Sequence, residues 1–353
     1  MATPHKHPAE RKSLALVLGG GAPNATLMAG SLEAFIDNKV EFDVVSTAGA
    51  GALIGLLYRA PHGGDPKAAL RALIDMGVDD NIYASFPVNY KVFNKPGQLA
   101  DFWRQLIAAN PLVSALQARQ DQSERNRFIS DWTQLMLAAL CPSDLGPGST
   151  GLCAHVPFID SVVDFDALSA TPGQFYLNAY NLSRRRMDNW DKTRIGKEQF
   201  LAALSFPFIY PPYKLGDDYY IEGAAIDTLN FKNLYQHHPQ KIDSLVVFDV
   251  LGCERLLHPP TDLYDAWVQS LIVPLVELAR DDLKLFEALH NIDPETGKAH
   301  SEVLRVNYER YLSQADFAQE LDWSHSNLAR LYDIGYEAGH AFCSTHAGSL
   351  GLA

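Results

Sequence analysis

The sequence predicts an α/β protein, a three-layer α/β/α sandwich built on a mostly parallel sheet. The continuous apolar run at 14–18 is typical of a buried parallel strand, because such strands are covered on both faces, and residues 242–250 show the clearest strand pattern in the chain. Residues 44–57 read VVSTAGAGALIGLL, in which a β-branched run passes through small residues into an apolar helical stretch. This pattern predicts a strand, a tight turn and a helix. Strands joined by helices in this way form sheets with helices on both faces.

The other elements follow from their own patterns. After the first strand, which ends in Gly19-Gly20-Gly21, we expect helix 25–38, strand 42–46, helix 51–59 and helix 65–77. Further along we expect strand 175–182, a turn at Arg184–Arg186, helix 197–204, a hairpin around Gly216–Asp218 and the strand 242–250.

Two regions are predicted to be helical. Aromatic helical segments alternate with Pro/Gly stretches over about 80–165, which we interpret as a helical insertion or cap over the sheet. We expect the C-terminal region, about 255–345, to be helical, with Thr261 or Asp262 and Ser324 or Ser326 as candidate N-caps. We predict a disordered polar lead over 1–13 and a single domain over 14–345.

Composition limits the function. The 353 residues are 47% hydrophobic and 20% charged, with a net charge of −13. An acidic surface repels phosphate backbones, which argues against nucleic acid and against strong attraction to anionic lipid. It does not argue against peripheral membrane contact through a local apolar face. The four scattered cysteines and the polar N-terminus indicate free thiols and a cytoplasmic location. The histidines show no metal-binding spacing.

The turn at residues 47–51 occupies the place of a nucleophile elbow. In hydrolases this elbow reads Gly-x-Ser-x-Gly, and it exposes the serine above the sheet beside a helix N-terminus. Here the five residues are Thr47-Ala48-Gly49-Ala50-Gly51, so glycine stands at the serine position. The register is fixed by Gly51-Ala52-Leu53. Loss of such a serine typically lowers turnover about a million-fold.

Two motifs in sequence order resemble the patatin-like phospholipases. The first is the apolar strand that enters Gly19-Gly20-Gly21, 28 residues before Gly49. The second runs from Ser205-Phe206-Pro207 to Tyr220-Ile221-Glu222-Gly223-Ala224. The resemblance covers about residues 14–250 and implies a patatin-type sandwich, a Ser–Asp dyad and no metal or organic cofactor. It implies an oxyanion hole from the amides of Gly19, Gly20, Gly21 and Ala50.

The chain departs from this family at the catalytic positions. The family's serine falls on Gly49 and its aspartate on Glu222, and Ala22-Pro23-Asn24 replaces the usual basic residue and glycine of the oxyanion loop. Glutamate reaches about 1 to 1.5 Å further than aspartate. We therefore expect Glu222 to activate a water, or a substrate proton, in the space left by the missing serine side chain. The alternative is that Glu222 is a relic, solvated or paired.

Other residues are expected around the same pocket. Strand ends surround the site in open α/β sheets, which favours Asn24, Thr47, Asn178 and Asp227 as pocket residues. The predicted helix from Leu263 to Leu289 carries apolar side chains that either pack on the core or dock a partner or membrane edge.

Three functions remain open from the sequence. The first is an acyl-processing enzyme that works without serine, with Glu222 as general base. The second is a pseudo-hydrolase that binds a lipid, an acyl ligand or a protein partner without turnover. The third is an ordinary acyl hydrolase whose serine has been replaced by Gly49. In each lipid-binding case the ligand is a lipid or acyl small molecule, and its chain length, its headgroup and the oligomeric state stay open.

Overall fold

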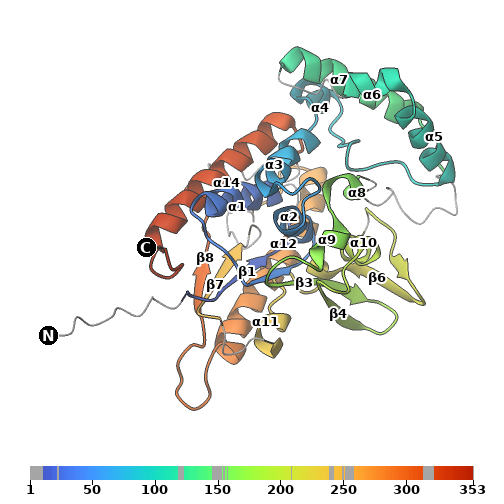
Figure 1. Ribbon diagram of the computed structural model, residues 1–353. Helices are drawn as coiled ribbons and strands as arrows, with labels where there is room; N and C mark the ends of the chain where they lie inside the picture. Colours follow the sequence, from blue (N-terminus) through green and yellow to red (C-terminus); the bar gives the residue numbers. More distant parts are fainter. Residues whose placement is uncertain are drawn as a thin grey trace.

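The fold is organised around one eight-stranded sheet (Figure 1). The computed structural model describes residues 11–21, 24–117, 123–144, 153, 156, 158–207, 209–237, 242–248, 250, 258–312 and 322–352. The strands are β1 (Leu14–Leu18), β2 (Val44–Thr47), β3 (Gln174–Asn181), β4 (Arg186–Asp191), β5 (Tyr213–Leu215), β6 (Asp218–Glu222), β7 (Ser244–Phe248) and β8 (Glu302–Arg305).

The centre of the sheet is parallel. The strand order is β5-β6-β3-β2-β1-β7-β8, and β4 also pairs with β3. β1 is parallel to β2 and β7, β2 to β3, and β7 to β8. β4 and β6 are antiparallel to β3, and β5 is antiparallel to β6. The predicted α/β fold with a mostly parallel sheet is therefore confirmed, with its antiparallel strands gathered beside β3.

Helices cover both faces of this sheet. Those of the sandwich and its connections are α1 (Ala25–Asp37), α2 (Ala50–Arg59), α3 (Pro66–Arg71), η1 (Ala72–Met76), α8 (Ile159–Val162), α9 (Phe165–Leu168), α10 (Lys197–Ala203), η2 (Gly223–Ala225), α11 (Lys232–His237), α12 (Leu263–Leu285), the π-helical turn η4 (Phe286–His290) and α14 (His325–Thr345). In Figure 1, α14 lies alongside α1.

The core divides into two layers because strand side chains alternate between faces. Leu14, Leu16 and Leu18 of β1 join a cluster with residues of α1, α2 and α14. Ala15 and Val17, which point the other way, join a cluster with residues of α11, α12 and η4. Every residue of β1 is buried. The first apolar run of the sequence is thus the middle strand between two helical layers.

The helical insertion forms an arm. Its helices are α5 (Gln98–Ala108), α6 (Pro111–Gln117) and α7 (Glu124–Leu140), and α4 (Asp80–Ser85) lies at its root. In Figure 1 these helices stand away from the sheet instead of lying flat over it. At the root, Lys91 forms an ion pair of 2.7 Å with Asp131 of α7, and both side chains are buried. We call the segment 98–140 the arm.

The sequence missed two strands. β4 follows the turn at Arg184–Arg186, where Arg185 has a φ of 54°. β8 interrupts the C-terminal region that was expected to be helical, and it pairs with β7 at the sheet edge. The expectation of continuous helix there is therefore wrong. The strand Glu302–Arg305 is only four residues long and buries one of its side chains, so the sequence shows no apolar run that would reveal it. Asp262 caps α12, as predicted, through the Asp265 amide at 2.9 Å.

Other sequence predictions meet the limits of the described chain. Cys141, Cys153 and Cys343 are unpaired, and Cys253 lies outside the described residues. Most of the predicted polar lead, 1–10, also lies outside them, as does the Pro/Gly stretch 145–150. Within the described chain, we found no helix with both the length and the apolar character needed to cross a membrane.

Candidate active site

The elbow between β2 and α2 keeps the backbone of a nucleophile turn without a nucleophile. Gly49 precedes α2 with φ 51° and ψ −130°, a conformation that side-chain-bearing residues rarely adopt. A Cβ at Gly51 would lie 2.3 Å from the Leu18 carbonyl oxygen, so α2 approaches β1 closely only because Gly51 has no side chain. The predicted strand–turn–helix is therefore present in its strained form.

Four amides surround the elbow. The amides of Gly51 and Ala52 donate to the carbonyls of Ala48 and Gly49, at 3.0 and 2.9 Å. Among the described residues, none accepts a hydrogen bond from the amides of Gly49 or Ala50. These two N–H groups at the α2 N-terminus are therefore available to a ligand.

The glycine loop after β1 supplies further amides. The Gly19 amide donates to the Phe248 carbonyl at 3.2 Å, which continues the β1–β7 pairing. The prediction of Gly19 as an oxyanion donor is therefore wrong. Gly20 and Gly21 line the cavity described below, together with Ala50, and no described residue accepts from the amides of these two glycines. Ala22 and Pro23 lie outside the described residues.

Glu222 ends β6 directly opposite the elbow. In the sheet, Glu222 lies opposite Ala179 of β3, and the Glu222 amide donates to the Ser205 carbonyl at 3.0 Å. A Cβ built on Gly49 would lie 2.1 Å from Glu222 Oε1, 3.2 Å from Cδ and 2.7 Å from the Ala224 Cβ. The glutamate carboxyl group therefore fills the space where a side chain at the elbow would stand.

This position corrects one expectation and bears on another. We expected a water between Glu222 and the elbow, but the carboxyl group itself takes that space, so a water could reach Glu222 only from the cavity side. The relic alternative required a solvated or paired carboxylate. Glu222 is 8% exposed, and no residue in the described part of the chain forms a hydrogen bond with its carboxyl group.

Burial changes the protonation of this group. It raises the pKa of Glu222 to about 8, because an unpaired charge is poorly solvated there. Tyr210 lies in the same wall of the cavity, and burial, with smaller contributions from Cys153 and Glu222, raises the pKa of its phenol above the usual range. Near neutral pH both groups are therefore mainly protonated, and Glu222 loses its proton as the pH approaches 8.

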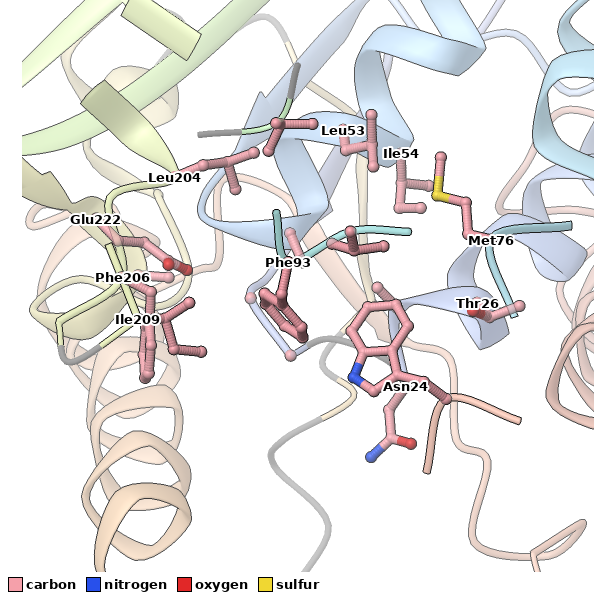
Figure 2. A pocket seen from close by; sticks show the side chains of 18 of the residues that line it. Asn24, Thr26, Leu53, Ile54, Met76, Phe93, Leu204, Phe206, Ile209 and Glu222 are labelled. Carbon is pink, nitrogen blue, oxygen red and sulfur yellow. The ribbon is translucent and has the colours of Figure 1, made fainter. Parts of the chain in front are cut away.

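Glu222 opens into an apolar cavity of about 230 Å³. Figure 2 shows its carboxyl group pointing into the cavity from one wall, with Leu204, Phe206 and Ile209 nearby and Met76 across the space. Among the described lining residues, Glu222 is the one with an acidic or basic side chain. A mostly apolar cavity with one reactive polar end is the usual form of a site for a small apolar ligand.

The predicted pocket residues divide into two groups. Asn24 lines the cavity, at the entrance to α1. Thr47 does not: its hydroxyl donates to the Tyr176 carbonyl at 2.8 Å inside the sheet. Asn178 donates to the Asp227 carbonyl at 3.0 Å and packs on Gly223, so it supports the segment after Glu222. Asp227 is absent from the described lining, and burial together with Asp282 raises its pKa to about 7.

The sequence did not identify a large part of the lining of the Glu222 cavity. It includes Phe93 from the segment before the arm, Trp323, and a face of α12 that carries Trp267, Leu271 and Leu275. The apolar face of α12 thus lines the cavity, whereas we had considered core packing or docking. Only the aromatic content of 80–165 hinted that the insertion reaches the site.

No cluster of three or more His, Cys, Asp or Glu side chains suited to a metal ion occurs in the portion of the chain that the structure describes.

Comparison with known proteins bears on the family of this chain. Residues 16–235 match the family described as patatin-like phospholipase. VipD from Legionella pneumophila aligns at 14% identity and a TM-score of 0.37, covering 96% of this chain and 67% of that one. Human GIVD cytosolic phospholipase A2 aligns at 9% identity and a TM-score of 0.43, covering 97% of this chain and 60% of that one. No curated protein sequence matched. From its family match, the chain belongs to the patatin-like phospholipase family.

Proposed function

We propose that this protein processes an acyl ester without a serine nucleophile, with Glu222 as the general base. One observation carries the proposal: the Glu222 carboxyl group stands against Gly49, at the polar end of an apolar cavity that Gly20, Gly21 and Ala50 also line. This arrangement keeps the parts of an acyl-transfer site and replaces the attacking group.

The chemistry follows from that arrangement. The acyl chain lies in the apolar cavity, and its carbonyl oxygen accepts hydrogen bonds from the loop and elbow amides. Deprotonated Glu222 removes a proton from a water on its cavity side, and the water attacks the carbonyl carbon. The amides stabilise the tetrahedral oxyanion. Glu222 then returns the proton to the departing alcohol, so that one water and one ester give an acid and an alcohol.

A second function is favoured by the protonation of Glu222. With a pKa of about 8, the carboxyl group is mainly neutral at pH 7 and can donate a hydrogen bond. A neutral donor beside unoccupied amides suits the carbonyl or carboxylate of a bound acyl ligand. Under this alternative the protein is a pseudo-hydrolase that holds a lipid without turnover.

The third alternative, an ordinary hydrolase that has merely lost its serine, is less well supported. A side chain at position 49 would meet the Glu222 carboxyl group and the Ala224 Cβ. Restoring serine alone therefore requires Glu222 to turn away.

The test is hydrolysis of a panel of acyl esters and phospholipids by the native protein and by Glu222→Gln at equal concentration. The amide keeps the size of the side chain and removes its basicity. A general base contributes about 10² to 10⁴-fold, so the native rate should fall by that factor in the variant. If neither folded protein hydrolyses any ester, the enzymatic proposal fails. Acyl-ligand binding measured by calorimetry then tests the pseudo-hydrolase alternative.

A further inference from the structure

The arm exposes apolar side chains in two ordered stripes. Leu99, Phe102 and Leu106 follow one another on α5 at spacings of three and four, and Ile129, Trp132 and Met136 do the same on α7. Each of these six side chains is 37–64% exposed. Single exposed apolar residues are common, but stripes at helical spacing on neighbouring helices form a surface that marks an interaction site.

An open groove lies between the helices that carry these stripes. It has a volume of about 880 Å³ and is lined by Trp103 and Ile107 of α5 and by Trp132 and Leu135 of α7. The Trp103 indole donates to the Leu137 carbonyl at 3.3 Å, which holds the two helices together. The groove is therefore a built part of the arm, and Trp132 and Met136 both line it and belong to the exposed stripe.

The groove adjoins the cavity of Glu222. Met76, Phe93 and Phe158 line both spaces. In Figure 2, Phe93 and Met76 lie across the cavity from Glu222. These three apolar side chains therefore lie at the boundary between the groove of the arm and the cavity that holds Glu222.

The net charge of the arm indicates which kind of lipid surface it fits. Over the described arm, three acidic and three basic residues balance: Asp101, Glu124 and Asp131 against Arg104, Arg125 and Arg127. The whole chain carries −13. A neutral apolar face on an acidic protein fits a zwitterionic lipid surface, because the rest of the molecule is repelled by anionic lipid.

We propose that the arm docks on a zwitterionic lipid bilayer and that an acyl chain passes through its groove to Glu222. The docking surface consists of the two stripes on α5 and α7. The route past Met76, Phe93 and Phe158 rests on the proposed function of the Glu222 cavity, whereas docking itself does not.

The experiment is co-sedimentation with phosphatidylcholine vesicles at physiological ionic strength. The arm variant is Phe102→Ser/Leu106→Ser/Ile129→Ser, three exposed side chains that do not line the groove. The matched control is Leu182→Ser/Leu285→Ser/Leu289→Ser, which removes equally exposed apolar side chains elsewhere. We expect the native protein and the control to bind alike and the arm variant to bind at least tenfold more weakly. Circular dichroism and melting temperature verify that all three proteins are folded.

Brominated phosphatidylcholine locates the contact. Bromine quenches a tryptophan only at short range, so the emission of Trp132 should fall on binding, and Trp132→Phe should lose most of that change. Trp267 is also exposed, at the cavity. Quenching that survives in Trp132→Phe and disappears in Trp267→Phe would move the contact to α12 and overturn the proposal.

Three other results would also overturn it. They are no binding to phosphatidylcholine vesicles, binding that requires anionic lipid, and a concentration-dependent dimer in ultracentrifugation that the arm variant abolishes. The last result would identify a second copy of the chain as the occupant. Glu222→Gln separates the two proposals: vesicle binding that persists in this variant with loss of ester hydrolysis supports both. Vesicle binding by a native protein that hydrolyses nothing leaves docking intact and removes the enzymatic function.

Discussion

The cavity wall around Glu222 and the arm differ in the exposure of their side chains: the wall buries them, whereas the arm leaves the apolar stripes of α5 and α7 in solvent. Around the elbow, strand pairing, burial and the close approach of the backbone fix the positions of Gly49 and Glu222. The Glu222 carboxyl group is enclosed there. In the arm, helices are joined by few contacts and leave large apolar side chains in solvent. The wall therefore resembles a preserved scaffold with altered chemistry, and the arm resembles a surface that is completed by something else.

The largest effect on stability should come from the protonation of Glu222. Burial raises the pKa of Glu222 from an ordinary 4.5 to about 8, so the folded protein holds a proton that the unfolded chain releases. The free energy of unfolding should then fall as the pH rises from about 4.5 to 8, by up to about 5 kcal/mol for this group at about 1.4 kcal/mol per pH unit.

Urea unfolding of the native protein and Glu222→Gln at pH 5 and pH 8.5 measures this contribution. The difference in stability between the two proteins should grow in favour of the variant at the higher pH. Equal pH dependence in both would mean that Glu222 is not buried as a neutral acid.

The next largest effect on stability should come from the buried Lys91–Asp131 ion pair at the root of the arm. Lys91→Met leaves the buried Asp131 carboxylate without its cation, which costs about 3–5 kcal/mol when a buried pair is broken. Asp131 also accepts from the Asp79 amide at 2.7 Å, so the loss should open the arm. Limited proteolysis within 98–140 should accelerate while the sheet stays protected. Lys284→Met, in an exposed pair, is the control and should change nothing measurable.

The next prediction tests whether the elbow still accepts a nucleophile. Gly49→Ser alone should give no gain in ester hydrolysis, because Glu222 occupies the space of the new side chain. Gly49→Ser/Glu222→Asp should exceed either single variant by about 100-fold, since the shorter carboxylate frees that space and an activated hydroxyl opens the covalent route. An equal gain from Gly49→Ser alone would show that Glu222 moves aside readily. Initial rates with a soluble short-chain ester measure the difference.

The smallest effect should come from the backbone of the elbow. Gly51→Ala places a methyl group 2.3 Å from the Leu18 carbonyl oxygen, and overpacking of this kind costs about 1–3 kcal/mol. Gly348→Ala meets no atom within 4 Å and should be nearly neutral. Thermal unfolding of the two variants compares them, and equal melting temperatures would show that α2 can retreat from β1.

The sequence predicted the parts of this molecule that depend on neighbours along the chain. β1 and the β2–α2 elbow were visible because apolar runs and small residues are contiguous there. β8 was missed because a four-residue edge strand needs no apolar run. Glu222 and Gly49 were paired by motif order, but the filling of the elbow by the carboxyl group depends on the φ of Gly49 and the reach of Glu222 across the sheet, which no local pattern contains. Phe93 and Trp323 reach the cavity through tertiary packing alone.

The mutual fit of Gly49 and Glu222 has a consequence for descent. Serine restored at position 49 would meet the carboxyl group, and aspartate restored at 222 would find no nucleophile to serve. Neither single step back toward a Ser–Asp dyad offers selection an improvement, so the exchange acts as an evolutionary ratchet. Relatives of this chain should therefore carry glycine at the elbow and glutamate at the dyad position together, inherited as one character and not as two.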